Sequence, residues 1–134
     1  MEKLHLYLVR HCESLGNREN IFQGQLDLDI SATGEKQLAL LALRFRNIPI
    51  DAVYSSPLKR AYKTAEAVNL YHSLPIIELP ELMEVDVGAL SGMKLDKAFT
   101  DYPVFAEKWQ NSPQNCIFPE GETTAEVYDR AKKA

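Results

Sequence analysis

Apolar and polar positions fall into separate blocks along this chain, and the first block is a short apolar run. Residues 4–9 are almost entirely apolar, include Tyr and Val, and lack turn-forming residues, which predicts a buried strand. Apolar runs at 51–55 and 74–79 predict two further strands, and helical spacing predicts helices over 31–46 and 57–70. This alternation predicts an α/β fold with a mostly parallel sheet and right-handed crossovers.

Local signals mark where helices begin. Ser31 is an N-cap candidate, and Ser56 precedes a proline at the first expected helical position. Residues 95–109 predict one or two short helices interrupted near Pro103, and Thr123 with Glu126 forms a capping box that opens a last helix. Polar or Gly- and Pro-rich stretches predict loops at residues 16–28, 81–92 and 111–121.

Composition narrows the classes of partner. The chain has 134 residues, 46% of them hydrophobic and 25% charged, which are ordinary values for one globular domain over residues 1–134. A net charge of −4 argues against nucleic acid or an anionic membrane as a partner, and no apolar run approaches the ~20 residues that span a bilayer. Two cysteines give no disulfide framework, so we expect a cytoplasmic location. No cluster has metal-ligand spacing, so we expect no metal and no other cofactor.

The most informative polar pair follows the first expected strand. Arg10 and His11 stand side by side where that strand ends, and ligands of α/β sheets bind beyond the carboxyl ends of strands. Phosphoryl transfer needs a nucleophile and fixed positive charge around the phosphoryl oxygens. A neutral imidazole supplies the first and a guanidinium the second. The alternative is an exposed arginine beside a structural histidine.

A second mechanism fits the same stretch. His11, Cys12 and Arg18 form an H-C-x5-R string, in which Cys12 would be a thiolate nucleophile and Arg18 would bind phosphate. Glu13 would add negative charge to such a loop, and Glu19 stands where cysteine-dependent phosphatases usually have Ser or Thr. Both features disfavour the cysteine mechanism.

Five ordered blocks, spanning nearly the whole chain, decide between the alternatives. The first, Arg10-His11-x-Glu13-Ser14-x-x-Asn17, resembles the R-H-G-E-[ST]-x-x-N signature of the histidine phosphatase superfamily, also called phosphoglycerate mutase-like. The other blocks contain Gln23-Gly24 with Ser31-x-x-Gly34, Ser55-Ser56-Pro57 with Arg60 and Thr64, Leu82-Met83-Glu84, and Pro119-x-Gly121-Glu122 with Arg130.

The resemblance implies a role for each site residue. His11 would be the nucleophile and pass through a phosphohistidine, while Arg10 and Arg60 would bind the phosphoryl oxygens. Glu84 would protonate the leaving alkoxide and then activate water. Substrate contacts would come from Asn17, Gln23 and Gly24 in addition to the two arginines.

The resemblance also implies a fold and two departures from it. The family has a three-layer sandwich whose central, mostly parallel sheet contains the first strand. Cys12 stands where the family usually has Gly, and we expect its small side chain to be accommodated. The family's second catalytic histidine has no counterpart, because His5 and His72 lie in other contexts. We therefore expect an incomplete domain that lacks the last strand or strands and helix. Truncation of the chain at its C-terminal end and a separate chain that completes the fold both stay open, as does a homo-oligomer.

The expected activity is hydrolysis of a small-molecule phosphomonoester. The region between Glu84 and Pro119 is short, and in its length it resembles the small phosphatases, such as alpha-ribazole phosphatase, more than the mutases. Two alternatives remain open at this point: phosphoglycerate mutase-type transfer, and binding of phosphorylated ligands without turnover.

Overall fold

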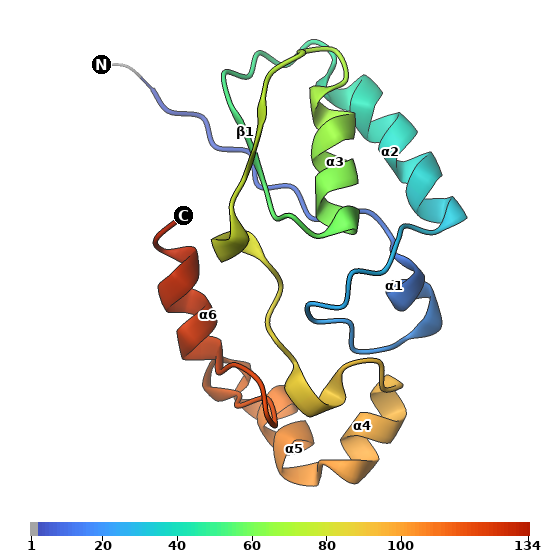
Figure 1. Cartoon of the computed structure of the whole chain (residues 1–134), viewed down its shortest axis with the longest axis vertical. Helices are drawn as coiled ribbons and strands as arrows, with labels where there is room; N and C mark the ends of the chain where they lie inside the picture. The colour runs from blue at the N-terminus through green and yellow to red at the C-terminus, as the bar shows by residue number, and fades with distance from the viewer. Residues whose placement is uncertain (1–2) are drawn as a thin grey trace.

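The computed structural model describes residues 3–134 (Figure 1). In chain order the elements are α1 (Leu15–Glu19), α2 (Ala32–Phe45), β1 (Val53–Ser55), α3 (Lys59–Asn69), β2 (Ile76–Glu78), the 3₁₀ helices η1 (Pro80–Leu82) and η2 (Gly88–Leu90), α4 (Leu95–Asp101), α5 (Pro103–Asn111), η3 (Pro113–Asn115) and α6 (Thr124–Ala131).

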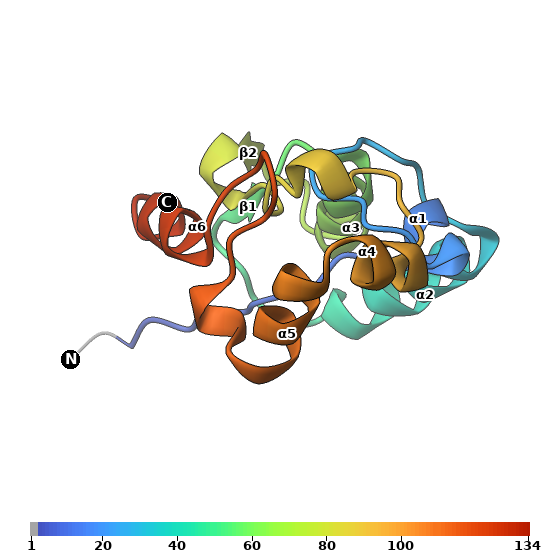
Figure 2. The same cartoon turned by 90° about the horizontal axis from the view of Figure 1, so that it is seen from below.

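The unit β1-α3-β2 is the centre of the upper half of the molecule. The two strands are parallel, with Val53 opposite Ile76 and Ser55 opposite Glu78, and α3 packs against both. Helix α2 packs on α3, while α6 lies on the other side of the strands in both views (Figures 1 and 2). The predicted α/β class with parallel strands is confirmed.

The strand predicted at residues 4–9 is wrong. This segment is extended but makes no ladder, and Leu4 and Leu8 are 93% and 87% exposed. A strand requires a neighbour that exchanges backbone hydrogen bonds with it, and none of the segments within residues 3–134 does so. An apolar pattern alone supplies no hydrogen-bonding partner, so it does not by itself produce a buried strand.

Two of the predicted N-caps are present at the starts of α2 and α6. Ser31 and Thr123 accept hydrogen bonds from the N–H groups of Gly34 and Glu126, as predicted. Helix α3, however, begins at Lys59 rather than at the expected proline.

Helix α1 occupies the start of the stretch expected to be an irregular loop over residues 16–28. The break near Pro103 is confirmed by the separation of α4 from α5.

The main hydrophobic core lies around α4 and α5, in the lower half of the molecule as drawn in Figure 1. Its buried members are Phe22, Val87, Leu90, Ala98, Phe105, Cys116 and Phe118. Several aromatic rings meet there, including Phe105 and Phe118 at 5.0 Å between centroids. Val87 and Leu90 of the core come from the segment around η2, and Val85 packs against it. No helix in the described part of the chain has the length and apolar character to cross a membrane.

Candidate active site

His11 is held in one tautomer by the main-chain carbonyl of the next residue. Its Nδ1 lies 2.6 Å from the carbonyl oxygen of Cys12, and because a carbonyl only accepts, Nδ1 carries the proton. The lone pair of the ring is therefore on Nε2. Partial burial is the largest cause that lowers the pKa of His11, and the hydrogen bond to the Cys12 carbonyl opposes it. The positive charges of Arg60 and Arg10 lower the pKa further, and the negative charge of Glu84 raises it slightly, so the net direction is downward. At neutral pH the imidazole is uncharged and can act as a nucleophile.

Arg10 and Arg60 differ in how they are placed. Arg10 is exposed beside His11. Arg60, in the first turn of α3, is only 1% exposed and donates to the carbonyl oxygens of Gly24 (2.7 Å) and Leu26 (2.9 Å). These contacts use two of its five N–H donors. Arg60 thus fixes the loop that precedes α2 and also supplies charge to the site.

Thr64 joins α3 to the segment that carries His11. Its buried hydroxyl accepts a hydrogen bond from the Cys12 N–H at 3.0 Å and donates to the Arg60 carbonyl at 2.7 Å. Cys12 itself is buried and does not have a positive φ, so the position that is usually Gly accepts a side chain, as expected.

The cysteine mechanism receives no support from this geometry. Burial raises the pKa of the Cys12 thiol, which opposes thiolate formation. Arg18 lies on the exposed side of α1 and pairs with Glu19 at 3.5 Å, so it does not enclose the thiol.

The predicted substrate contacts are largely occupied by the protein. The Asn17 side chain accepts from the Ser14 N–H at 3.0 Å, and Gln23 is buried with its carbonyl oxygen 2.6 Å from the Ser14 hydroxyl. Gly24 has a φ of +49° and its carbonyl is bound by Arg60. These residues shape the loop beside the site, and their contact with substrate remains a prediction.

Glu84 enters the site from the segment after η1. Its negative charge raises the pKa of both His11 and Arg60, which puts the three groups within electrostatic reach of each other. The carboxylate is exposed and accepts from the Val85 N–H at 2.9 Å. Its main-chain carbonyl accepts from the Gln25 side chain at 3.2 Å, which connects the acid-bearing segment to the loop held by Arg60.

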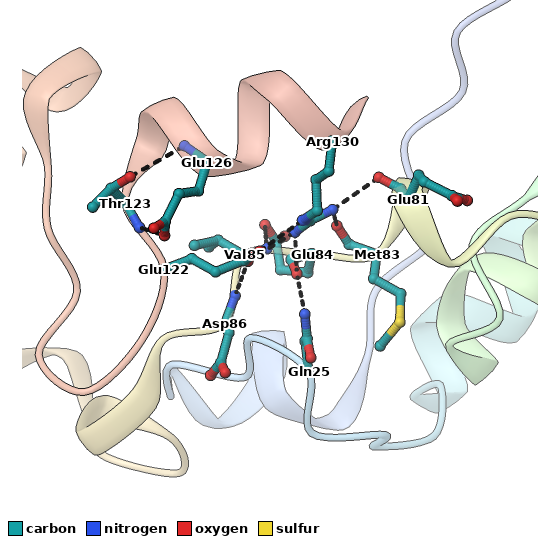
Figure 3. A network of polar contacts seen from close by, with 10 residues as sticks. All are labelled: Gln25, Glu81, Met83, Glu84, Val85, Asp86, Glu122, Thr123, Glu126 and Arg130. Atoms are coloured by element: carbon teal, nitrogen blue, oxygen red, sulfur yellow. Dashed lines mark hydrogen bonds and ion pairs between the residues drawn. The ribbon is translucent and has the colours of Figure 1, made fainter. Parts of the chain in front are cut away.

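Arg130 of α6 is the contact that the residue pattern did not assign a role. Its guanidinium donates to the carbonyls of Glu81 (2.8 Å), Met83 (2.7 Å) and Glu84 (3.0 Å), and binds the Glu122 carboxylate through two bonds of 2.8 and 2.9 Å (Figure 3). The signal available in the sequence was its place in the last of the five blocks. Within residues 3–134, no three His, Cys, Asp or Glu side chains gather closely enough to hold a metal ion.

Comparison with known proteins identifies the family of this chain. The histidine phosphatase superfamily (branch 1) matches residues 6–134, and the chain belongs to this superfamily. Phosphoserine phosphatase 1 of Hydrogenobacter thermophilus is 40% identical over 127 residues, which cover 95% of this chain and 60% of that protein. A probable phosphoglycerate mutase of Erwinia tasmaniensis is 31% identical over 131 residues, covering 98% and 61%.

A solved structure extends the comparison to the fold. The crystal structure of the alpha-ribazole phosphatase from Shigella flexneri superimposes with a TM-score of 0.83 at 26% identity, covering 93% of this chain and 62% of that one. The present chain therefore spans about 60% of the length of the curated relatives it matches.

Proposed function

We propose that this chain catalyses hydrolysis of a small phosphomonoester through a phosphohistidine at His11. The observation that carries the proposal is the hydrogen bond from His11 Nδ1 to the Cys12 carbonyl, which leaves Nε2 unprotonated. Burial, with a smaller effect of Arg60 and Arg10, lowers the pKa of the ring and favours its uncharged form, and the two arginines provide the positive charge that phosphoryl oxygens require. Membership of the superfamily and the relatives named as phosphatases support the same activity.

The reaction proceeds in two displacements. Nε2 of His11 attacks phosphorus, the bond from phosphorus to the leaving oxygen breaks, and protonated Glu84 gives that oxygen its proton. The Glu84 carboxylate then takes a proton from water as the water oxygen bonds to phosphorus and the phosphorus–nitrogen bond breaks. Inorganic phosphate and neutral His11 result, with Arg10 and Arg60 stabilising the charged oxygens in both steps.

The phosphoenzyme provides a direct test. Incubation with ³²P-labelled O-phosphoserine, chosen because a 40% identical relative is named for phosphoserine, should give labelled protein that is stable to alkali and labile to acid. His11→Ala should abolish both label and phosphate release, and Cys12→Ser should retain them. The reverse pattern in these two variants would identify Cys12 as the nucleophile and overturn the proposal.

A phosphoglycerate mutase activity is the second candidate, favoured by the 31% identity to a probable mutase. The two activities share the phosphohistidine but differ in what accepts the phosphoryl group. Interconversion of 3- and 2-phosphoglycerate with little phosphate release would favour the mutase.

The third candidate is binding without turnover. It predicts that phosphate or vanadate raises the thermal midpoint while phosphate release stays at the level of His11→Ala.

We infer a cytoplasmic location, supported by the two free, buried cysteines, and a small-molecule ligand, supported by the net charge of −4. The exposed apolar side chains of residues 4–9 support coverage by a second copy or another chain. Fractionation of cells and sedimentation of the purified chain test these two points.

A further inference from the structure

The guanidinium of Arg130 donates to five acceptors of the protein at once. A guanidinium has five N–H donors in one plane, and the three carbonyls and the two carboxylate oxygens around Arg130 accept one hydrogen bond for each donor. The side chains of Arg130 and Glu122 are only 20% and 23% exposed. All five donors are therefore engaged within the protein, and none is left for substrate.

The carboxylate partner of Arg130 is itself fixed to the same segment. Glu122 accepts from the Asp86 N–H at 2.8 Å through Oε2, which also accepts from Nη2 of Arg130. The Glu122 N–H donates to the Asp86 carbonyl at 2.9 Å. The main chain is thus bound at Glu81, Met83 and Glu84 by Arg130, and at Asp86 by Glu122 (Figure 3). Glu84 lies in the middle of this bound segment.

We propose that Arg130 is a positioning residue that fixes where the Glu84 carboxyl can lie. It does not touch that carboxyl in the structure and acts through the three carbonyls it binds. Loss of these contacts would free residues 81–84 from α6, and among the residues that the structure describes only Gln25 would still donate to the Glu84 carbonyl. This inference rests on the proposed function, in which Glu84 protonates the leaving oxygen.

Arg130→Lys is the informative variant, because lysine retains the charge opposite Glu122 but cannot span five acceptors in one plane. The measurement is kcat/KM for two substrates, since this parameter reports the steps up to release of the leaving group. O-Phosphoserine has a poor leaving group that needs the proton of Glu84, whereas p-nitrophenyl phosphate has a good one. We expect kcat/KM to fall about 100-fold for the first and by no more than about threefold for the second, as for a misplaced general acid.

Two further measurements separate positioning from general loss of structure. The Val85 amide, which donates to the Glu84 carboxylate, should exchange its hydrogen faster in Arg130→Lys, while the thermal midpoint measures overall folding. Arg46→Lys, at an exposed position that ends α2, is the matched control and should leave all three readouts unchanged.

The outcomes are distinct. Equal losses for the two substrates, or no loss for O-phosphoserine, would overturn the positioning role. A wild-type chain whose phosphate release equals that of His11→Ala would instead contradict the proposed function. In that case unchanged Val85 exchange in Arg130→Lys would overturn the positioning role as well, and faster exchange with an unchanged midpoint would support it.

Discussion

Replacing Gly34 by alanine tests how closely α2 must approach the segment that carries His11. A Cβ at this position would lie 2.2 Å from the Glu13 carbonyl oxygen and 3.2 Å from the Cys12 sulfur. The first distance is far below van der Waals contact, and the obstacle is main chain, so backbone must move. The same carbonyl accepts from the Ser31 N–H at 3.0 Å, so the movement would also strain a hydrogen bond that joins α2 to this segment.

The size of the effect follows from opposing contributions. Overpacking against main chain costs about 3 kcal/mol and the strained hydrogen bond about 1 kcal/mol. Alanine in place of glycine in a helix returns about 1 kcal/mol. The free energy of unfolding should therefore fall by about 3 kcal/mol, which lowers the thermal midpoint of a chain of this length by about 10 °C.

Urea unfolding followed by circular dichroism measures this change. Thr33→Ala, at the preceding exposed position of the same helix, is the control and should change stability by less than about 0.5 kcal/mol. In a double-mutant cycle, Cys12→Ala should not restore Gly34→Ala, because the principal contact is with the carbonyl. A Gly34→Ala chain as stable as wild type, or one rescued by Cys12→Ala, would refute the reasoning.

Three further results are expected. Burial and the nearby arginines lower the pKa of His11 below 6.5, so its ring should titrate below that pH in an NMR experiment. The stability that His11 contributes should be full above pH 6.5 and decline as the pH falls toward the pKa of the folded state. A ring that titrates at or above pH 6.5 would contradict this. Thr64→Val should cost about 1–3 kcal/mol in chemical denaturation because the buried Cys12 N–H loses its acceptor, whereas Thr64→Ser should stay near wild type. The hydrogen bonds of Arg130 hold the pKa of Glu122 below its usual 4.5, so the stability that Glu122 contributes should be lost as the pH falls from about 4.5 through the lower pKa of the folded state. Glu122→Gln should remove this part of the acid dependence of stability. An unchanged dependence of stability on acid pH in this variant would argue against the ion pair of Glu122 with Arg130.

Much of the local structure could be predicted from neighbouring residues. The caps at Ser31 and Thr123, the break before Pro103 and the parallel pair β1 and β2 depend on short-range pattern, and each is present. Helix α1 was missed because its cap, Ser14 with Asn17, stands in a stretch with no apolar periodicity. A five-residue helix has too few turns to show a stripe.

The sequence by itself determined the superfamily and the pairing of Arg10 with His11, since both are properties of adjacent residues and ordered blocks. Tertiary structure alone decided which groups hold the side chains of the site in place. The tautomer of His11 depends on the direction of one carbonyl, and Arg60 meets Gly24 across 36 positions.

The same distinction explains the two largest differences from the pattern. Residues 4–9 have the composition of a strand, yet a ladder depends on a neighbouring backbone that composition does not specify. Arg130 binds the Glu84 carbonyl across 46 positions, because folding places α6 beside the segment after β2. Sequence determines which side chains can donate, and the packed fold decides which acceptors they meet.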